Sequence, residues 1–400
     1  MADRDNDIVV VALARTPFGR FNGALKDIDA PALGALAINE VLARTKTAQS
    51  TVDVLYAGVG MIASAMLTPV RQAVLLSQLP ETTPSATIDR ACCSGMTAIG
   101  MAMKDIRCGE ARSAICGGFE SLSRTPVLWP RQRGRAIGDV AVTDPLLMRG
   151  SVVDRPISVY SGDEAVRHGI DRERQDEWAL RSHERYFQAE ATGYFNFERF
   201  ALDVPQKTVG TVRFVADESP RSDTSFEKLA ALKTVYGSKT ITAGNAPGLN
   251  DGAAFLAITT RKRAVEHGLE PLARLVDYVQ VCGGPTSGTV TPATAIRQLA
   301  TRKRMAAIDW DLVEINEAYA ATPLVSTHVM ADGNESEAAK LRAKTNVHGG
   351  AVAIGHPLGA SGARLVMTLI NGLMARGGGR GVAAICGGFG QGDAVMVTVD

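Results

Sequence analysis

The sequence predicts an α/β protein whose core consists of two similar halves, with a third region inserted into the chain between them. Three observations lead to this prediction: strand-like apolar runs alternate with helical segments, one hexapeptide occurs twice, and the residues between its copies differ in character. The chain has 400 residues, which is more than one ordinary hydrophobic core accommodates, so two or three domains are expected.

The alternation of strands and helices begins at the N-terminus. Residues 8–14 are a continuous apolar run rich in β-branched side chains, which is typical of a strand buried on both faces. Residues 30–42 have helical spacing, and residues 52–59 again predict a buried strand. Such alternation favours helices packed in layers against sheets.

The duplication is indicated by the hexapeptide Ala-Ile-Cys-Gly-Gly-Phe, which occupies residues 114–119 and again residues 384–389. Each copy follows a Ser-Gly pair, at 94–95 and 361–362, that opens an apolar helix. Because the flanking turn, helix and strand recur with the hexapeptide, a duplicated unit explains the match better than chance does. Two copies predict a pseudo-twofold arrangement of two halves.

The residues between the copies have a different composition. They contain a basic run over residues 129–135, a long polar helix and few buried strands. Asp171 is expected to cap that helix at its N-terminus, and Gly193 to mark its end. We expect this region to cover a site. The predicted division is 1–120 for the N-terminal half, 121–250 for the inserted loop domain, 251–270 for a return segment to the core and 271–400 for the C-terminal half.

Composition argues against several classes of partner. Lys and Arg number 43 and Asp and Glu 42, so the net charge of +1 gives no general attraction to nucleic acid or to an acidic membrane. No apolar run of the ~18 residues needed to span a membrane is evident. Six cysteines without a Cys-x-x-Cys pair, and an N-terminus without a targeting pattern, predict reduced thiols in the cytoplasm. The His and Cys spacing matches no zinc site, so no metal is expected.

Cys92 is the first candidate for chemistry. It lies in a turn of small residues between a strand-like segment and an apolar helix. The positive end of that helix would favour the thiolate, and the small neighbours would let a substrate approach the sulfur. The alternative is a buried structural cysteine, the usual fate of a free thiol. Cys93 is expected to pack away from the site.

His356 lies in the duplicate of the Cys92 turn, so the pseudo-symmetry could bring the two together. A histidine beside a cysteine is the usual means of activating a thiol, although a turn histidine bound to backbone remains an alternative. Cys386 opens the glycine-rich run 386–392, whose N–H groups suit an oxyanion hole or a plain tight turn. Asn316 could line a pocket or cap a helix.

The other histidines are weaker candidates. A structural role is expected for His348. The remaining four, which occupy polar predicted helices or their ends, are expected at the surface: His168, His183, His267 and His328. The glycine runs lack the spaced acidic partner of a dinucleotide-binding fingerprint, which argues against a Rossmann domain.

Taken together, these segments resemble the thiolase family over nearly the whole chain. The matching segments, in family order, are residues 14–19, 92–96, 117–123, 242–248, 250–254, 316–320, 355–357 and 386–390. The resemblance implies a five-layer αβαβα core of two duplicated halves, an inserted loop domain and a homotetramer built from dimers. It also implies acyl transfer between acyl-CoA and coenzyme A, which are substrates and products, without a cofactor.

The resemblance further implies a role for each candidate residue. Cys92 would be the acylated nucleophile, His356 its base, and Cys386 the group that moves a proton at the α-carbon of the acetyl thioester. One oxyanion hole would comprise His356 and a water held by Asn316. The other would comprise the N–H groups of Cys92 and Gly388. The implied reaction is thiolysis of 3-ketoacyl-CoA and the reverse Claisen condensation of two acetyl-CoA molecules to acetoacetyl-CoA.

Contacts with the substrate follow from the same resemblance, with two departures. Arg221 resembles an arginine that contacts the adenine end of coenzyme A. The other expected substrate contacts are Tyr160, Ala246, Pro247, Gly248 and His348. Pro247 replaces a serine that touches coenzyme A in some relatives, and residues 158–164 replace a Met-Gly-x-Thr-Ala-Glu stretch that lines the acyl pocket.

Three alternatives remain. The first is a degradative thiolase for longer acyl chains, and the second is a decarboxylating enzyme of the ketoacyl synthase type. That class pairs its cysteine with two histidines, whereas this chain offers two cysteines and one histidine. The third is a thiolase-like protein that binds acyl-CoA without catalysis. The presence of Cys92, His356 and Cys386 together argues against this third alternative.

Overall fold

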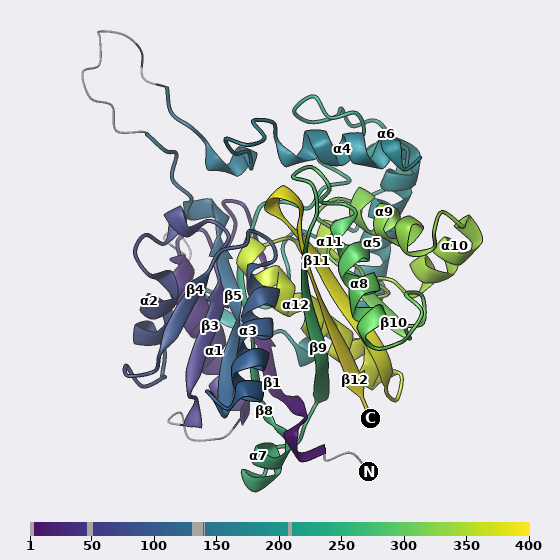
Figure 1. The fold of residues 1–400 in the computed structure, drawn as a ribbon. Helices are drawn as coiled ribbons and strands as arrows, with labels where there is room; N and C mark the ends of the chain where they lie inside the picture. The colour runs from purple at the N-terminus through teal and green to yellow at the C-terminus, as the bar shows by residue number, and fades with distance from the viewer. Residues whose placement is uncertain (1–3, 46–50, 130–138, 140, 207–209) are drawn as a thin grey trace.

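The computed structural model describes residues 4–45, 51–129, 139, 141–206 and 210–400. The first three residues and most of the basic run that begins at Trp129 lie outside the described residues. Arg4, the first described residue, forms an ion pair with the C-terminal residue Asp400 at 3.5 Å, at the lower edge of the view in Figure 1.

Two four-strand units with the same pairing pattern form most of the main sheet. In one unit β3 runs parallel to β5, β5 pairs antiparallel with β8, and β8 pairs antiparallel with β1. In the other unit β10 runs parallel to β11, β11 pairs antiparallel with β12, and β12 pairs antiparallel with β9. The strands of this sheet are β1 (Ile8–Arg15), β2 (Gly19–Arg20), β3 (Val54–Gly58), β4 (Ser85–Ile88), β5 (Ser113–Ser121), β8 (Asn250–Thr260), β9 (Ala273–Cys282), β10 (Leu312–Ile315), β11 (Gly379–Gly387) and β12 (Gln391–Val399). The repeated order confirms the predicted duplication, and only two residue pairs between β1 and β9 join the units.

Helices cover both units and also lie between them, which makes five layers (Figure 1). The outer helices of the N-terminal half are α1 (Ala30–Thr45) and α2 (Pro69–Leu76); those of the C-terminal half are α8 (Thr291–Arg302), α9 (Ala321–Met330) and α10 (Glu335–Ala343). The central layer is α3 (Ser94–Cys108) and α12 (Leu358–Ala375). Two helices outside this layering are α7 (Arg261–Glu266) and α11 (Ala351–Ile354). The predicted αβαβα core is confirmed.

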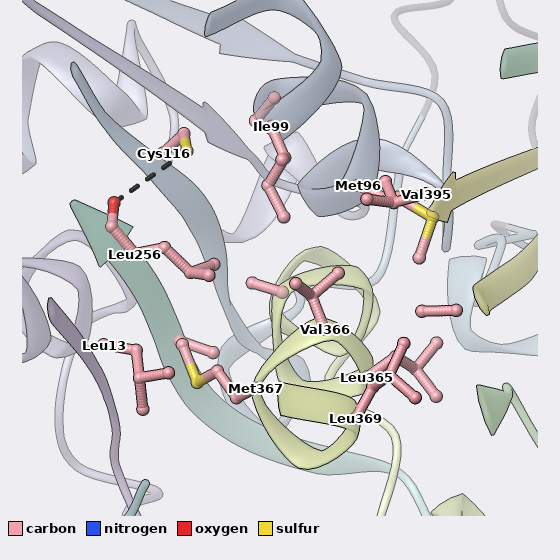
Figure 2. Close-up of a cluster of buried hydrophobic side chains, with 14 of the residues drawn as sticks. Leu13, Met96, Ile99, Cys116, Leu256, Leu365, Val366, Met367, Leu369 and Val395 are labelled. Atoms are coloured by element: carbon pink, nitrogen blue, oxygen red, sulfur yellow. Dashed lines mark hydrogen bonds between the residues drawn. The ribbon is translucent and has the colours of Figure 1, made fainter. Parts of the chain in front are cut away.

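The largest buried cluster lies around α3 and α12. Met96 and Ile99 of α3 and Val366 of α12 pack there between Leu256 of one unit and Val395 of the other (Figure 2). Alternate residues of each strand face this cluster or an outer one, as the two-residue period of a strand dictates. The early predictions of a strand at 8–14, a helix at 30–42 and a strand at 52–59 are confirmed by β1, α1 and β3.

α12 is long and apolar enough to pass a length-and-composition test for a membrane-spanning helix, alone among the helices of the described part of the chain. The sequence predicted no such segment. The helix lies between the two four-strand units, and 83% of its apolar window is buried, so it is a helix of the protein core.

The chain between the two hexapeptides forms α4 (Ile157–Arg167), α5 (Arg172–Ala191), α6 (Phe226–Ala230) and a two-stranded sheet of β6 (Leu202–Gln206) and β7 (Gly210–Phe214). The Asp171 side chain accepts a hydrogen bond from the N–H of Arg174, which confirms the predicted cap of α5. Gly193 follows the last turn of that helix in the left-handed conformation, with φ of 71°.

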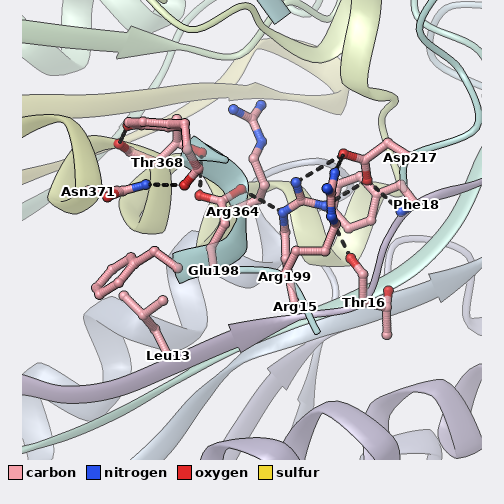
Figure 3. A network of polar contacts seen from close by, with 12 residues as sticks. Leu13, Arg15, Thr16, Phe18, Glu198, Arg199, Asp217, Arg364, Thr368 and Asn371 are labelled. Atoms are coloured by element: carbon pink, nitrogen blue, oxygen red, sulfur yellow. Dashed lines mark hydrogen bonds and ion pairs between the residues drawn. The ribbon is translucent and has the colours of Figure 1, made fainter. Parts of the chain in front are cut away.

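Buried ion pairs fasten this region to the core. Arg15 at the end of β1 is wholly buried, and it donates from Nε to Glu198 at 2.6 Å and from Nη1 to Asp217 at 2.7 Å (Figure 3). Arg199 pairs with the same Asp217 carboxylate at 3.2 Å. Because a buried charge without its partner is strongly unfavourable, these pairs hold the inserted segment against the N-terminal half.

Candidate active site

Cys92 lies in a strained turn between β4 and α3. Ala91 before it has φ of 51°, a conformation that residues with a Cβ rarely adopt. The turn is held because the Arg90 N–H donates to Ser94 Oγ at 2.8 Å and Ser94 Oγ donates to the Ala91 carbonyl at 2.6 Å. Cys93 at the helix cap is fully buried with its sulfur near the Ile385 carbonyl, so it packs as expected.

Glycines allow the starts of α3 and α12 to touch. A Cβ at Gly95 would lie 2.2 Å from the Gly359 carbonyl oxygen, and one at Gly362 would lie 2.3 Å from the Met96 nitrogen. A larger residue at either position would push the helices apart. The contact brings the Cys92 turn against the turn that carries His356.

His356 lies in the short connection between α11 and α12, and its orientation is set by two polar neighbours. Its backbone N–H donates to Asn250 Oδ1 at 2.9 Å, and its ring Nδ1 is 2.6 Å from Ser361 Oγ. The Ser361 hydroxyl donates its one hydrogen to the Pro357 carbonyl at 2.8 Å, so Nδ1 must carry the proton in that contact. Nε2 is therefore left with a lone pair, 3.4 Å from Asn316 Nδ2.

Asn316 is fully buried at the end of β10, and its backbone N–H donates to the Ala384 carbonyl of β11. α9 begins at Ala321 without a side-chain cap, so Asn316 does not cap that helix. Its Oδ1 has no hydrogen-bond partner among the described residues, although buried polar atoms normally have one. That oxygen is thus placed to hold a water or a substrate group.

Glu317, the next residue, anchors this segment. It is buried and accepts hydrogen bonds from Trp178 Nε1 and Ser182 Oγ of α5, both at 2.8 Å, and from the N–H of Val352 at 3.0 Å. The sequence marked the Asn-Glu pair but did not predict that the two side chains point to different partners. Glu317 joins α5, α11 and the end of β10, and thereby fixes the backbone of Asn316.

Cys386 occupies the end of β11, and the turn after it packs on the Cys92 turn. A Cβ at Gly387 would lie 2.9 Å from Cys93 Sγ, and one at Gly388 would lie 3.2 Å from the Ala91 Cβ. The negative charge of an ionised Cys386 would raise the pKa of Cys92, because like charges repel.

The equivalent cysteine of the first hexapeptide has a different environment. Cys116 points into the central cluster, with its sulfur 3.8 Å from the Leu256 carbonyl (Figure 2). β5 continues to Ser121, beyond its hexapeptide, whereas β11 ends at Gly387, inside the second copy. The copies also differ in the side that they turn to the central cluster, which Cys116 faces in β5 and Ile385 faces in β11.

Burial sets the protonation of the three candidate groups. It raises the pKa of Cys92 well above its usual value and that of Cys386 to about 12. It lowers the pKa of His356 to about 3, with a smaller contribution from the charge of Arg364. The sequence predicted a thiolate at Cys92 from the helix dipole, and this is wrong for the resting protein because desolvation outweighs the helix terminus. Burial thus leaves two neutral thiols and a neutral imidazole on turns that pack together.

Two adjacent cavities lie at this site. One, of about 240 Å³, reaches His356 and is lined by Tyr319, Leu358 and residues of the inserted region; the other, of about 700 Å³, lies toward Arg221. The residues that line both are Ala243, Ala246, Gly248 and Leu249. The structure therefore gathers four of the six expected substrate contacts along one path: Arg221, Ala246, Pro247 and Gly248.

The other two expected contacts lie elsewhere. Tyr160 of α4 is buried, its hydroxyl has no partner among the described residues, and an ionised Cys386 or Cys92 would raise its pKa. Its hydroxyl therefore remains available to a ligand or a water. His348 stacks on Tyr194 with ring centroids 3.7 Å apart and is not part of either cavity wall.

His183 corrects one surface prediction. It is buried on the inner face of α5, and its Nδ1 accepts a hydrogen bond from the backbone N–H of Arg221 at 3.2 Å. The polar composition of α5 suggested exposure, but the helix packs one side against α11 and the chain around Arg221.

Asn250, which holds His356, was recognised only as part of a matching segment. Among the described residues no group of three His, Cys, Asp or Glu side chains is arranged to hold a metal ion.

Comparison with known proteins agrees with this geometry. Two family models match, "Thiolase, N-terminal domain" over residues 8–262 and "Thiolase, C-terminal domain" over residues 269–399. The beta-ketoadipyl-CoA thiolase of Pseudomonas aeruginosa is 37% identical over 98% of both chains, and the acetyl-CoA acetyltransferase of Allochromatium vinosum is 35% identical over 98% of this chain and 99% of its own.

Solved structures give the same result. The acetyl-CoA acetyltransferase of Bacillus anthracis superimposes with a TM-score of 0.92 at 34% identity, covering 99% of this chain and 100% of its own. Human mitochondrial 3-ketoacyl-CoA thiolase in complex with CoA superimposes with a TM-score of 0.91 at 35% identity, covering 98% of both chains. On its sequence and its fold alike, the chain belongs to the thiolase family.

Proposed function

We propose that this protein is an acetyl-CoA C-acetyltransferase, which cleaves acetoacetyl-CoA with coenzyme A and condenses two acetyl-CoA molecules in the reverse direction. The observation that carries the proposal is the packing of the turns that bear Cys92, Cys386 and His356, with Nε2 of His356 unprotonated, beside a cavity that reaches His356 and adjoins a larger one at Arg221. This set of groups can move protons and form a thioester without a metal or a redox group.

In thiolysis the first step would be acylation of Cys92. His356 Nε2 takes the Cys92 proton as the sulfur attacks the keto carbon of the substrate. The bond between that carbon and the α-carbon then breaks, and the departing acetyl-CoA enolate takes a proton from Cys386. The products of this step are acyl-Cys92, imidazolium, the Cys386 thiolate and acetyl-CoA.

The second step would return every group to its starting state. The thiol of free coenzyme A gives its proton to the Cys386 thiolate and attacks the acyl carbon. The Cys92 sulfur leaves and takes the proton from the His356 imidazolium. Condensation is the same sequence in reverse, in which Cys386 removes the α-proton of acetyl-CoA.

Two oxyanion holes would stabilise the charges that develop. The N–H groups of Cys92 and Gly388 lie on turns that touch, and are proposed to bind the oxygen of the acyl group on Cys92. The unpartnered Oδ1 of Asn316 supports a water beside His356, which would bind the enolate oxygen. Each such donor contributes about 3 to 4 kcal/mol to transition-state stabilisation in a site of this kind.

Coenzyme A is proposed to occupy the larger cavity as a substrate. Arg20, Arg221 and Lys228 line it and supply the positive charge that its phosphates require. Ala246, Pro247 and Gly248 would flank the pantetheine arm, and Tyr160 would contact the acyl group. For His348, which stacks on Tyr194, we propose a structural role.

The lining of the smaller cavity favours a short uncharged acyl group. No Lys or Arg is among the described residues that form its wall, which includes Met148, Ile157 and Tyr319. A dicarboxylic acyl chain, such as the one in the name of the Pseudomonas aeruginosa relative, would place a carboxylate there without a counter-charge. The acyl chain of acetoacetyl-CoA carries no carboxylate and so needs no counter-charge.

We also propose a cytoplasmic homotetramer assembled as a dimer of dimers. The support is an exposed apolar surface on α2 and the segment before it, formed by Met66, Leu67, Leu75 and Leu76. Contiguous exposed apolar side chains of this kind commonly mark contacts between subunits. Light scattering of the purified protein measures the assembly directly.

The decisive experiment follows the cleavage of acetoacetyl-CoA by free coenzyme A. The unmodified protein should be active, and Cys92→Ala should lose nearly all activity while keeping its fold. Equal rates for the two proteins would instead support an acyl-CoA binding protein without catalysis. A series of 3-ketoacyl-CoA substrates of rising chain length, together with a dicarboxylic one, then measures the acyl preference.

A further inference from the structure

Both turns at the proposed acyl site contain a non-glycine residue in the left-handed conformation. Ala91 precedes Cys92 with φ of 51°, and Phe389 follows Gly388 with φ of 57°. The turns touch, since a Cβ on Gly388 would lie 3.2 Å from that of Ala91. Strained residues of this kind persist only where surrounding contacts hold them.

One chain of side-chain hydrogen bonds connects the two turns. Arg90, next to Ala91, donates from Nε to Gln391 Oε1 at 2.8 Å. Gln391, two residues beyond Phe389, donates from Nε2 to the Gly388 carbonyl at 3.1 Å. The Gln391 amide thus accepts a hydrogen bond from the Cys92 turn and donates one to the Gly388 turn. Arg90 and Gln391 lie 301 residues apart in the chain.

The Arg90 end of this chain is itself held in place. Its guanidinium forms an ion pair with Asp393 and donates to Thr97 Oγ1 at 2.9 Å. Asp393 is fully buried and also accepts hydrogen bonds from Thr97 at 2.6 Å and from the Tyr278 hydroxyl at 2.8 Å. Arg90 therefore offers Nε–H to Gln391 from a fixed position.

We propose that Arg90 and Gln391 are positioning residues for acyl transfer, which together set the separation of the Cys92 and Gly388 N–H groups. The inference rests on the proposed function, because it is the acyl oxygen that those two donors would bind. Gly388 has no side chain to restrict its torsions, so the bond from Gln391 to its carbonyl fixes the direction of the whole turn. A donor displaced by a fraction of an ångström loses much of its effect on a developing oxyanion.

The test uses Gln391→Glu. Glutamate keeps an oxygen for Arg90 but replaces the donor by an acceptor that repels the Gly388 carbonyl. Gln298→Glu is the matched control, since it adds the same charge at an exposed position of α8. Two rates are measured. The first is formation of acetyl-Cys92 from acetyl-CoA, by rapid quench and intact mass. The second is deuterium uptake by the methyl group of a further acetyl-CoA on enzyme already acetylated at Cys92, expressed per acetylated enzyme, which is the step assigned to Cys386.

In Gln391→Glu we expect acylation to slow by about 10- to 100-fold and deuterium uptake to stay within about twofold. Arg90→Lys, which keeps the charge beside Asp393 but lacks Nε–H, should show the same split. Acylation equal to that of the control would overturn the proposal. So would a parallel loss of both rates, which indicates a structural role only. Absence of acylation in the unmodified protein refutes the proposed function as well, so the two failures are distinguishable.

Discussion

His356 Nδ1 lies 2.6 Å from the hydroxyl of Ser361, and that hydroxyl donates its hydrogen to the Pro357 carbonyl. Ser361 therefore accepts from the ring and selects the tautomer in which Nε2 is the base. The serine belongs to the first turns of α12, the helix that His356 precedes. One helix thus supplies both the position of the imidazole and its protonation pattern.

Ser361→Ala should lower the turnover of acetoacetyl-CoA by about 10- to 100-fold, because the buried ring loses the partner that fixes its tautomer. Nδ1–H would be left unpaired, and the alternative tautomer would present an N–H to Cys92. Steady-state kinetics measure the effect. Ser326→Ala, which removes another buried hydroxyl that donates to a carbonyl, is the control for stability. Turnover equal to that of the control would contradict the assignment of the tautomer.

Cys386→Ala should separate acylation from carbon–carbon bond formation. The variant still carries Cys92 and His356, so it should accept an acetyl group from acetyl-CoA, although more slowly because the departing coenzyme A has no Cys386 proton to take. It has no group to exchange the α-proton. Intact mass measures acylation, and the acetoacetyl-CoA formed measures condensation. Cys116→Ala, at the equivalent position of the first half, is the matched control and should retain condensation. Loss of acylation in Cys386→Ala would contradict the division of roles.

The stability of the protein should depend on the protonation of His348. Burial lowers its pKa to about 4, below the ~6.5 of an unfolded chain. The unfolded chain therefore binds more protons between these values, and the histidine lowers the free energy of unfolding as pH falls from about 6.5 toward 4. His348→Gln removes this dependence, so its loss of stability between pH 7 and pH 5 should be smaller by about 1 to 2 kcal/mol. Urea unfolding at the two pH values measures the loss of stability of each protein. Equal losses in the unmodified protein and in His348→Gln would contradict the prediction.

Asp217→Asn should destabilise the protein by about 3 to 5 kcal/mol, because Arg15 and Arg199 would remain buried without the carboxylate they share. Asp203→Asn is the control from the same inserted region. Its pair with Arg213 is exposed and 3.9 Å long, so the change should cost less than about 1 kcal/mol. Urea unfolding compares the two, and similar losses would show that the buried network is unimportant.

Much of the fold could be predicted from local sequence. The buried strand at residues 8–14 and the cap at Asp171 depend on neighbouring residues alone, and both are confirmed. The hexapeptide predicted the duplication because it lies on strands that occupy the same position in both halves. Features of this kind need no knowledge of what packs against them.

The predictions that were wrong concern features that depend on distant residues. The pKa of Cys92 follows from burial by both halves, which the helix terminus alone does not indicate. His183 is buried because α5 packs against another segment, and its own helix is too polar to show this. The bond between Arg90 and Gln391 joins residues from opposite halves, so no local pattern predicts it. Burial and side-chain pairing across the chain require the folded coordinates.

The two copies of the hexapeptide show how little is needed to convert a packing residue into a reactive one. Cys116 and Cys386 have the same neighbours in sequence, yet β5 continues two residues past its copy while β11 stops two residues before the end of its own. Cys116 packs in the central cluster, whereas Cys386 stays buried but ends its strand beside the turn that carries Cys92. We expect that extending β11 to the length of β5 would remove the proton transfer assigned to Cys386 while leaving the fold unchanged.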